Sequence, residues 1–213
     1  NINWTLKLPK VTVSNATGQT TLKAGTVGNT WETKPSRVDG RYLHTAIWTG
    51  TEMIIWGGEQ FSKLNTGGRY DPATDSWRST SIGVNVPSAR IEHSVVWTGT
   101  EMIVWGGDTG SVLTNSGGRY DPLTDSWQPT SRGANVPSNR NVHTAVWSGT
   151  EMIIWGGNTN PLNSGGRYNP TTNSWQATSI DNNTPNERLF HKAIWADTKM
   201  IVWGGIISGN YFF

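Results

Sequence analysis

Short apolar runs alternate with polar turn segments along most of the chain. In one stretch, "HTAVW" (143–147) and "EMIIW" (151–155) are followed, after a glycine-containing loop, by "GGRY" (165–168) and "SWQATS" (174–179). Apolar runs of about four to eight residues bounded by Gly, Asn, Pro and Ser are typical of β-strands joined by turns. The pattern predicts four short strands in each such unit, named a, b, c and d in chain order.

Strand b is apolar on both of its faces. Alternation along a strand sends Met152 and Ile154 to one face, and Ile153 and Trp155 to the other. A strand with two apolar faces must be covered on both sides. We therefore expect strand b to lie in a sheet between two neighbouring sheets, and the more polar strand d to form the outer edge.

The four-strand unit recurs with spacings of 49, 50 and 48 residues. The phrase "SGTEMIIWGG" at 148–157 has near copies at 49–58 and 98–107, and a more divergent copy, "ADTKMIVWGG", at 196–205. The units begin near His44, His93, His143 and His191. Units that cannot bury both faces alone stack around an axis as the blades of a β-propeller. The sequence predicts an all-β propeller of about four repeats of four-stranded antiparallel blades.

Paired glycines, a tyrosine before a turn and a tryptophan after it form the motif "GG…GGRYDPATDSW". With this motif in each complete repeat, the chain closely resembles the kelch repeat over residues 41–205, in particular the kelch repeats of bacterial surface proteins. The resemblance implies a propeller domain. Some proteins of the kelch class are copper oxidases with a thioether-linked Cys-Tyr site. This chain cannot form such a site because it has no cysteine.

The two ends of the repeat region predict how the ring closes. The fourth repeat stops after strand b, while "GNTWETKPS" at 28–36 is similar to strand d. We expect 28–36 to complete the last blade, so that N- and C-terminal strands close a propeller over 25–213, and 208–213 to supply a shortened strand c. Residues 1–24 fit no repeat and are expected to add extension strands. Two alternatives stay open: the chain is one part of a larger propeller, or it forms a half ring that is completed by association into a homo-oligomer.

The bulk composition narrows the function classes. The 213 residues carry a formal net charge of +2, and the charged fraction is only 15%, with lysines and arginines spread along the chain. This distribution argues against nucleic acid as a partner, and no apolar run is long enough to span a membrane. The Thr-, Asn- and Gly-rich, Lys-poor composition, together with the kelch resemblance, predicts an extracellular or cell-surface location.

The b–c loops vary in length and content, whereas the a–b and c–d turns are short and uniform. Because successive strands alternate in direction, the b–c and d–a loops emerge on one face of the propeller. Variable loops on a rigid scaffold are typical of a binding surface. Apolar residues that we expect on this loop face are Phe61, Leu64, Val112 and Leu113.

An arginine precedes each repeat histidine by three positions. These pairs are Arg41/His44, Arg90/His93, Arg140/His143 and Arg188/His191. One hypothesis is an axial ring in which imidazoles and guanidiniums bind a ligand. The other is that each pair hydrogen-bonds a neighbouring blade, which the repetition in every blade favours because architecture must repeat and a site need not.

The sequence predicts a non-catalytic module that binds a protein or a glycan through its variable loops, with no cofactor, no metal and no catalytic residue. Glu52, Glu101 and Glu151 follow the a–b turn and are expected to be solvated turn residues. Three alternatives stay open: a lectin-like sugar-binding propeller with aromatic platforms between blades, a self-assembling structural protein, and a kelch-type sugar-processing enzyme with an axial site.

Overall fold

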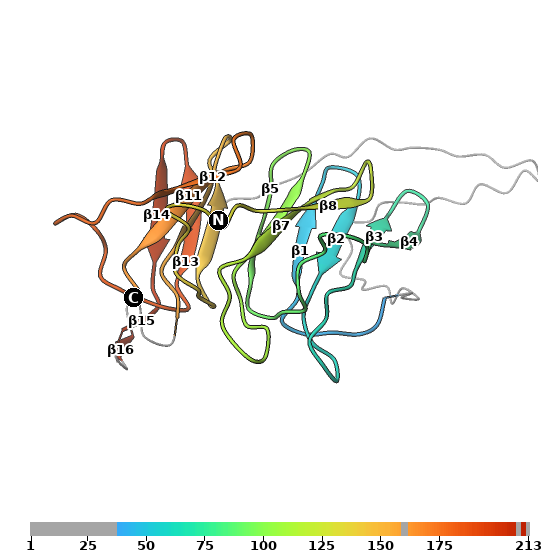
Figure 1. Ribbon diagram of the computed structural model, residues 1–213, viewed down its shortest axis with the longest axis horizontal. Helices are drawn as coiled ribbons and strands as arrows, with labels where there is room; N and C mark the ends of the chain where they lie inside the picture. Colours follow the sequence, from blue (N-terminus) through green and yellow to red (C-terminus); the bar gives the residue numbers. More distant parts are fainter. Residues whose placement is uncertain (1–37, 159–161, 208–209, 212–213) are drawn as a thin grey trace, which may run out of the picture. The chain divides into compact units, whose positions relative to one another are not determined.

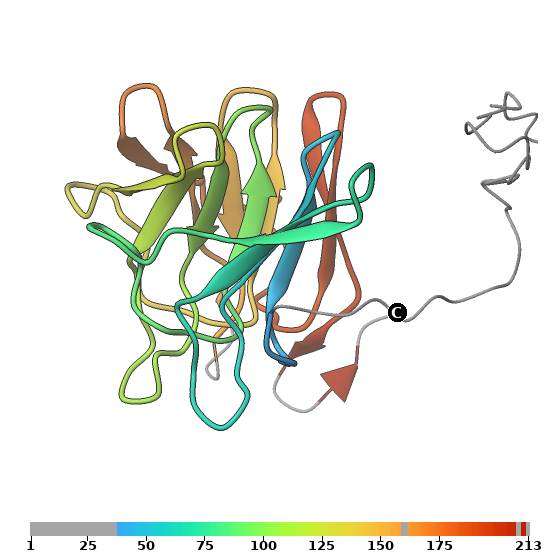
Figure 2. The ribbon, with the colours of Figure 1, turned by 90° about the vertical axis from the view of Figure 1, so that its right-hand side faces the viewer.

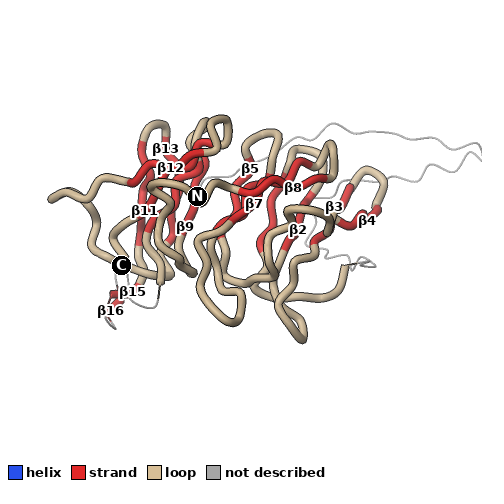
Figure 3. The backbone as a smooth tube through the Cα atoms, in the orientation of Figure 1, coloured by secondary structure: helices blue, strands red, loops and turns tan. Residues whose placement is uncertain are grey.

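The computed structural model describes residues 38–158, 162–207 and 210–211. These residues form strands and loops only, as Figure 3 shows. None of them belongs to a helix that is long and apolar enough to cross a membrane. The all-β fold class is therefore confirmed.

Three complete blades follow one another along the chain, each an antiparallel sheet with its strands in sequence order. The first contains β1 (Thr45–Trp48), β2 (Met53–Trp56), β3 (Gly67–Asp71) and β4 (Ser76–Ser79). The second contains β5 (Ser94–Trp97), β6 (Met102–Trp105), β7 (Gly117–Asp121) and β8 (Ser126–Pro129). The third contains β9 (Thr144–Trp147), β10 (Met152–Trp155), β11 (Gly165–Asn169) and β12 (Ser174–Ala177).

The register within a blade follows from the turns. In the third blade the turn between β9 and β10 places Trp147 opposite Met152, and Gly149 in this turn has a φ of 99° that favours glycine. Strands β11 and β12 pair Tyr168 with Trp175, and their ring centroids lie 5.0 Å apart. The tyrosine and tryptophan of the repeat motif are therefore cross-strand neighbours that pack together.

The blades stack through their first strands, which are the innermost strands of the array. Strand β1 packs against β5, β5 against β9, and β9 against β13, the first strand of the fourth repeat. Figures 1 and 2 show the short hairpin turns along one edge of the blades and the longer b–c loops along the opposite edge. We call these edges the turn face and the loop face.

Two apolar clusters fill the spaces between the complete blades. Between the first and second blades, Ile54 and Trp56 pack against a set from the second blade: Met102, Val104, Tyr120 and Trp127. The equivalent residues join the second and third blades: Val96, Ile103, Trp105, Met152, Ile154, Tyr168 and Trp175. Every residue of β6 and β10 is buried, so the prediction that strand b is covered on both faces is confirmed for these blades.

The fourth repeat forms two separate hairpins in the described residues. Strands β13 (Lys192–Ala196) and β14 (Lys199–Trp203) pair with each other. Strands β15 (Ile206–Ile207) and β16 (Asn210–Tyr211) pair in the position of a b–c loop. The expectation that 208–213 continues the blade as strand c is therefore wrong for Asn210 and Tyr211, because these residues pair with β15 and not with β14. The predictions for 1–24 and 28–36, and with them the closing of the ring, lie outside the described residues.

Candidate functional site

The repeat histidines connect neighbouring blades. His93 Nε2 lies 2.8 Å from Thr45 Oγ1, His143 Nε2 lies 2.9 Å from Ser94 Oγ, and His191 Nε2 lies 2.7 Å from Thr144 Oγ1. In each case the hydroxyl belongs to the innermost strand of the preceding blade. All three imidazoles are buried.

Each of these buried imidazoles packs edge-on against a tryptophan of the preceding blade, as His143 does with Trp105 at a centroid distance of 5.4 Å. A Cβ added to Gly106 would lie 2.6 Å from His143 Cε1. The glycine after strand b is therefore required by the close approach of the next blade's histidine.

Burial keeps these histidines neutral. Desolvation, followed by the charge of the arginine three positions earlier, lowers the pKa of His93 and His143 to about 3 and that of His191 to about 4. Neutral imidazoles at pH 7 add no positive charge to the centre of the array.

The repeat arginines hold the loops of their own blades. Arg90 Nη1 donates to the carbonyl oxygens of Gly106 at 2.9 Å and Ser116 at 2.7 Å, and Arg90 Nε donates to Ser88 O at 2.9 Å. Arg140 makes the same set of bonds in the third blade. Burial lowers the pKa of Arg90 and Arg140 to about 10, so both stay charged at pH 7.

The first and last copies of the pair have a similar geometry. Arg41 Nη1 donates to Gly57 O at 3.1 Å and Thr66 O at 2.7 Å, and Arg188 Nη1 donates to Gly204 O at 3.1 Å. His44, in contrast, is exposed. The histidines bond the preceding blade as the architectural hypothesis expects, whereas the arginine side chains bond loops of their own blades. A ligand-binding role of the axial ring stays a prediction. The described residues contain no group of three metal-ligating side chains that could hold an ion.

The residue before each repeat histidine adopts a left-handed backbone conformation. The φ angles are 55° at Leu43, 55° at Glu92, 47° at Val142 and 56° at Phe190. Side chains larger than glycine adopt this conformation at a cost of about 1–3 kcal/mol. This backbone conformation recurs in every repeat, but the side chain differs each time. On the loop face, the four positions therefore share one backbone geometry and present four different side chains. Sequence reasoning missed it because no glycine or asparagine marks the position.

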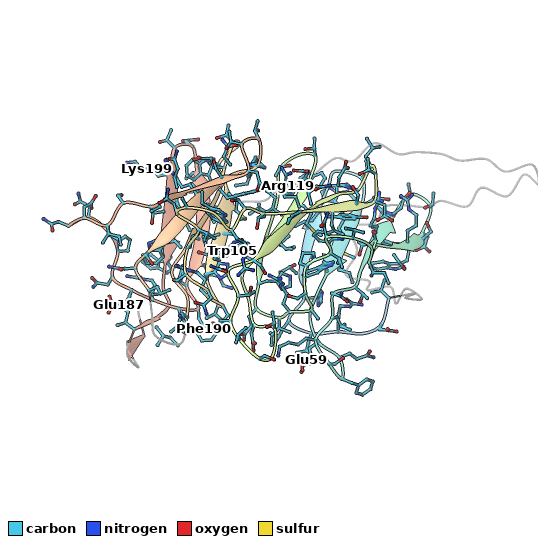
Figure 4. All side chains as sticks on the ribbon, viewed as in Figure 1. Glu59, Trp105, Arg119, Glu187, Phe190 and Lys199 are labelled. Atoms are coloured by element: carbon cyan, nitrogen blue, oxygen red, sulfur yellow. The ribbon has the colours of Figure 1, made fainter. Side chains whose placement is uncertain are left out.

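The loop face gathers exposed apolar side chains. Phe61 is 96% exposed at the tip of the first b–c loop, and Val112 is exposed in the second. Leu64 and Leu113, predicted beside them, are only partly exposed. The structure adds Tyr42, Leu43 and Phe190, which are exposed beside strand a. Figure 4 shows Phe190 and Glu59 toward the same edge of the array and Lys199 toward the other.

Two b–c loops on this face are tied together by charge. Lys63 Nζ lies 3.5 Å from Asp108 Oδ2, which joins the loop of the first blade to that of the second. The ion pair is partly exposed and contributes little stability by itself. It favours one relative arrangement of the loops that carry Phe61 and Val112.

The turn face carries the ionic networks of the blades. Glu52 is buried, and its Oε2 accepts hydrogen bonds from Arg69 Nε at 2.9 Å and Arg69 Nη2 at 2.7 Å, while Oε1 is paired with Arg78. Burial by itself raises the pKa of Glu52, but the bonds and charges of Arg69 and Arg78 outweigh it and hold the pKa below its ordinary value. The prediction of a solvated glutamate is therefore wrong for Glu52, because strands β3 and β4 bring two arginines onto it.

The equivalent pairs in the next two blades are looser. Arg119 Nη1 lies 3.7 Å from Glu101 Oε2, and Arg167 Nε lies 3.7 Å from Glu151 Oε2. Arg119 Nη1 also donates to Pro170 O at 2.6 Å, so it connects the second blade to the c–d turn of the third. Glu101 and Glu151 are partly exposed.

A model of the KLHDC2/KLHL20/DRC7 Kelch-repeats domain matches residues 19–205. The match covers most of the chain and includes all four histidine-anchored repeats. No curated protein matches the chain.

Proposed function

Because the chain belongs to the kelch-repeat family, whose domains bind protein partners, we propose that it is a non-catalytic module that binds a partner protein through its loop face. The observation that carries this proposal is the set of exposed apolar side chains on that face: Tyr42, Leu43, Phe61, Val112 and Phe190. Exposed apolar groups on a rigid scaffold supply the contacts that dominate protein–protein affinity.

The scaffold under these side chains supports the proposal. Leu43 and Phe190 occupy the constrained left-handed position beside the repeat histidines, and the loops carrying Phe61 and Val112 are joined by the Lys63–Asp108 pair. A preorganised surface loses less conformational entropy when a partner docks. Recognition by shape and apolar contact, without chemical turnover, is the mechanism that these features favour.

The proposal also includes a location outside the cell or on its surface. The support is compositional: only 15% of the residues are charged, and the chain is rich in Thr, Asn and Gly and poor in Lys. A protease applied to intact cells tests this location, because a surface protein is cleaved while cytoplasmic markers survive.

A face-specific crosslinking experiment tests the binding surface. A photoreactive phenylalanine derivative is placed at Phe61 on the loop face, and in a matched variant at Leu123, which is 93% exposed on the turn face. Proteins captured from the native source by the first variant but not by the second are then purified and titrated against the unmodified chain.

The titration decides the outcome. Phe61→Ser is expected to weaken the purified complex by about tenfold or more, because the complex loses an aromatic side chain that the partner covers. Leu123→Ser is expected to leave the affinity unchanged. A complex that weakens with Leu123→Ser and not with Phe61→Ser, or capture that is equal from both faces, contradicts the proposal.

A further inference from the structure

Two grooves open on the turn face, one at each interface between complete blades. The first has a volume of about 690 Å³ and the second about 490 Å³. Both lie opposite the loop face of the proposed protein contact. We propose that these grooves bind neutral saccharides, with the glutamate-arginine pair holding the hydroxyl groups and a tryptophan packing against the sugar ring.

The first groove combines the ionic network of one blade with an aromatic residue of the next. Glu52 directly precedes β2, Arg69 and Arg78 come from β3 and β4, and Trp97 comes from the end of β5. The remaining lining residues are Thr49, Thr51, Gly99, Thr100, Glu101, Asp121, Pro122 and Leu123. The Arg69 and Arg78 bonds fix the Glu52 carboxylate, so the polar groups of the groove are oriented before any ligand enters.

The second groove repeats this arrangement one blade further along. Glu101 directly precedes β6, Arg119 comes from β7, and Trp147 comes from the end of β9. Hydroxyl groups of Thr98, Thr100, Thr150, Thr171 and Thr172 line the same groove. An acid, an arginine, several hydroxyls and an indole therefore recur together at both interfaces.

The balance of charge identifies the class of ligand. In the first groove Arg69 and Arg78 stand against Glu52, Glu101 and Asp121. A phosphate or carboxylate ligand would approach the acidic groups, and an amine would approach the arginines, at an electrostatic cost. A neutral ligand whose groups both donate and accept hydrogen bonds can satisfy carboxylates, guanidiniums and threonine hydroxyls together.

The tryptophans narrow the class from polar molecules to sugars. Trp97 and Trp147 pack against the interblade clusters and are partly buried, yet they also line the grooves. An indole has a flat apolar face, and a pyranose ring has a flat face of C–H groups with hydroxyls around its edge. A groove with an aromatic wall beside paired charged donors and acceptors matches both parts of a sugar.

At the third interface Glu151, Arg167 and Trp195 hold the same repeat positions, but the hollow described beside Arg167 is lined by neither Glu151 nor Trp195, which supplies an internal comparison. Arg167 is more exposed than Arg69 or Arg119, and it is bonded to Gln176 of β12. The hollow beside it is lined by Arg167, Ala177, Thr178 and Ser179, without a tryptophan. We therefore assign sugar binding to the first and second grooves only.

Strand d distinguishes these two grooves and gives a mild variant for the test. Arg78 is paired with Glu52 in the first blade, whereas Gln128 and Gln176 hold the same register position in the next two blades. Arg78 lines the first groove only, so Arg78→Gln removes a charged donor from that groove and leaves the second groove unchanged. Arg78 is exposed, so the substitution leaves the core intact.

The experiment uses a printed array of neutral, sialylated and sulfated glycans, followed by NMR titration of the tryptophan indole resonances with D-galactose, L-fucose and N-acetyl-D-glucosamine. We expect neutral glycans to bind, with dissociation constants on the order of 1 mM for a single sugar. Signals of Trp97 and Trp147 should shift. Polymer-displayed sugar should bind about 100-fold more tightly because two grooves engage it together.

Three variants locate the binding. Glu101→Gln, which changes a residue of both grooves, is expected to weaken binding about tenfold or more, since a charged acceptor is lost. Arg78→Gln should reduce the shift of Trp97 and leave that of Trp147. Phe61→Ser, on the loop face, should change neither. Thermal unfolding of each variant verifies that it is folded.

Three results would overturn the proposal: no neutral glycan binds and no indole signal shifts, only sialylated or sulfated glycans bind, or binding is lost with Phe61→Ser but retained with Glu101→Gln. Because the proposed protein contact is tested at Phe61 on the opposite face, either function can fail without the other.

Discussion

The interfaces between complete blades and the outer faces of the first and fourth repeats are built from nearly the same sequence but differ in burial. Met102 and Met152 are fully buried, whereas Met53 at the same repeat position is partly exposed. Trp105 is 0% exposed and its counterpart Trp203 is 69% exposed. In β14 the side chains alternate between exposed and partly exposed, while every residue of β6 and β10 is buried. A repeat residue becomes core only when a neighbouring blade covers it.

The interface between the third and fourth repeats is an intermediate case. Ile153 and Trp155 face Met200 and Val202 across a cavity of about 290 Å³ that Ser179 and Pro185 also line. At the preceding interface, Trp175 of strand d packs on Trp105 and donates its indole N–H to Ser131 O at 3.1 Å. The cavity therefore lies where complete blades place the aromatic residues of strands c and d.

The largest expected effect is the loss of a tryptophan between two complete blades, compared with the loss of its counterpart on the outer face of the fourth repeat. Trp105→Ala should lower the free energy of unfolding by about 3–5 kcal/mol, because it removes a fully buried side chain from between two blades. Trp203→Ala, at the exposed counterpart, should change it by less than about 1 kcal/mol. Chemical denaturation of the two variants measures both values, and equal losses would show that the outer face of the fourth repeat is covered in solution.

A pH series tests the buried histidines as a group. An unfolded histidine titrates near pH 6.5, whereas the pKa values of His93, His143 and His191 are lowered to about 3, 3 and 4. Below about pH 6.5 the unfolded chain binds protons at these histidines that the folded chain does not bind. The stability that depends on the neutral histidines is therefore fully present above this pH and is lost as the pH falls. We expect a loss on the order of 1 kcal/mol per buried histidine between about pH 7 and pH 5. An equal free energy of unfolding in urea at pH 7 and pH 5 would contradict the buried neutral state of these histidines.

Single histidine substitutions refine the comparison. His143→Ala should cost about 2 kcal/mol, because it removes a buried ring and leaves Ser94 Oγ without this bond. His44→Ala, at the exposed copy, should cost less than about 0.5 kcal/mol. His143→Ala should also flatten the pH dependence of stability, an effect that a simple packing defect would not produce.

The smallest expected effect concerns a feature that does not depend on neighbours. Leu43 at the outer blade and Val142 between blades both have positive φ angles, of 55° and 47°. Leu43→Gly should raise the free energy of unfolding by about 0.5 kcal/mol, because glycine adopts this conformation without strain and Leu43 buries little surface. Thermal unfolding measures the change, and a clear destabilisation would mean that the side chain is covered by a contact in solution.

Strand order, turn positions and the two-sided burial of strand b were predictable because they depend on local alternation and on a period repeated along the chain. The contact of each buried repeat histidine with the preceding blade was also accessible, since the repetition is visible in the sequence, whereas the bonding of each arginine to loops of its own blade was not. The turn-face grooves were not, because Glu52, Arg69 and Trp97 are far apart in sequence and belong to two blades. Nor did any sequence signal predict that Leu64 and Leu113 would be less exposed than Phe61, because loop packing decides it.

The sequence by itself determined the blade: its strands, its glycines and the aromatic pair of strands c and d. The tertiary structure alone decided which copies of each residue became core, which glutamate is paired with two arginines, and which apolar residues lie exposed on the loop face. The physical reason is that strand formation depends on short-range backbone geometry, whereas burial and electrostatics depend on what lies across the interface. The same sequence motif therefore contributes a different amount to the free energy of folding in different repeats.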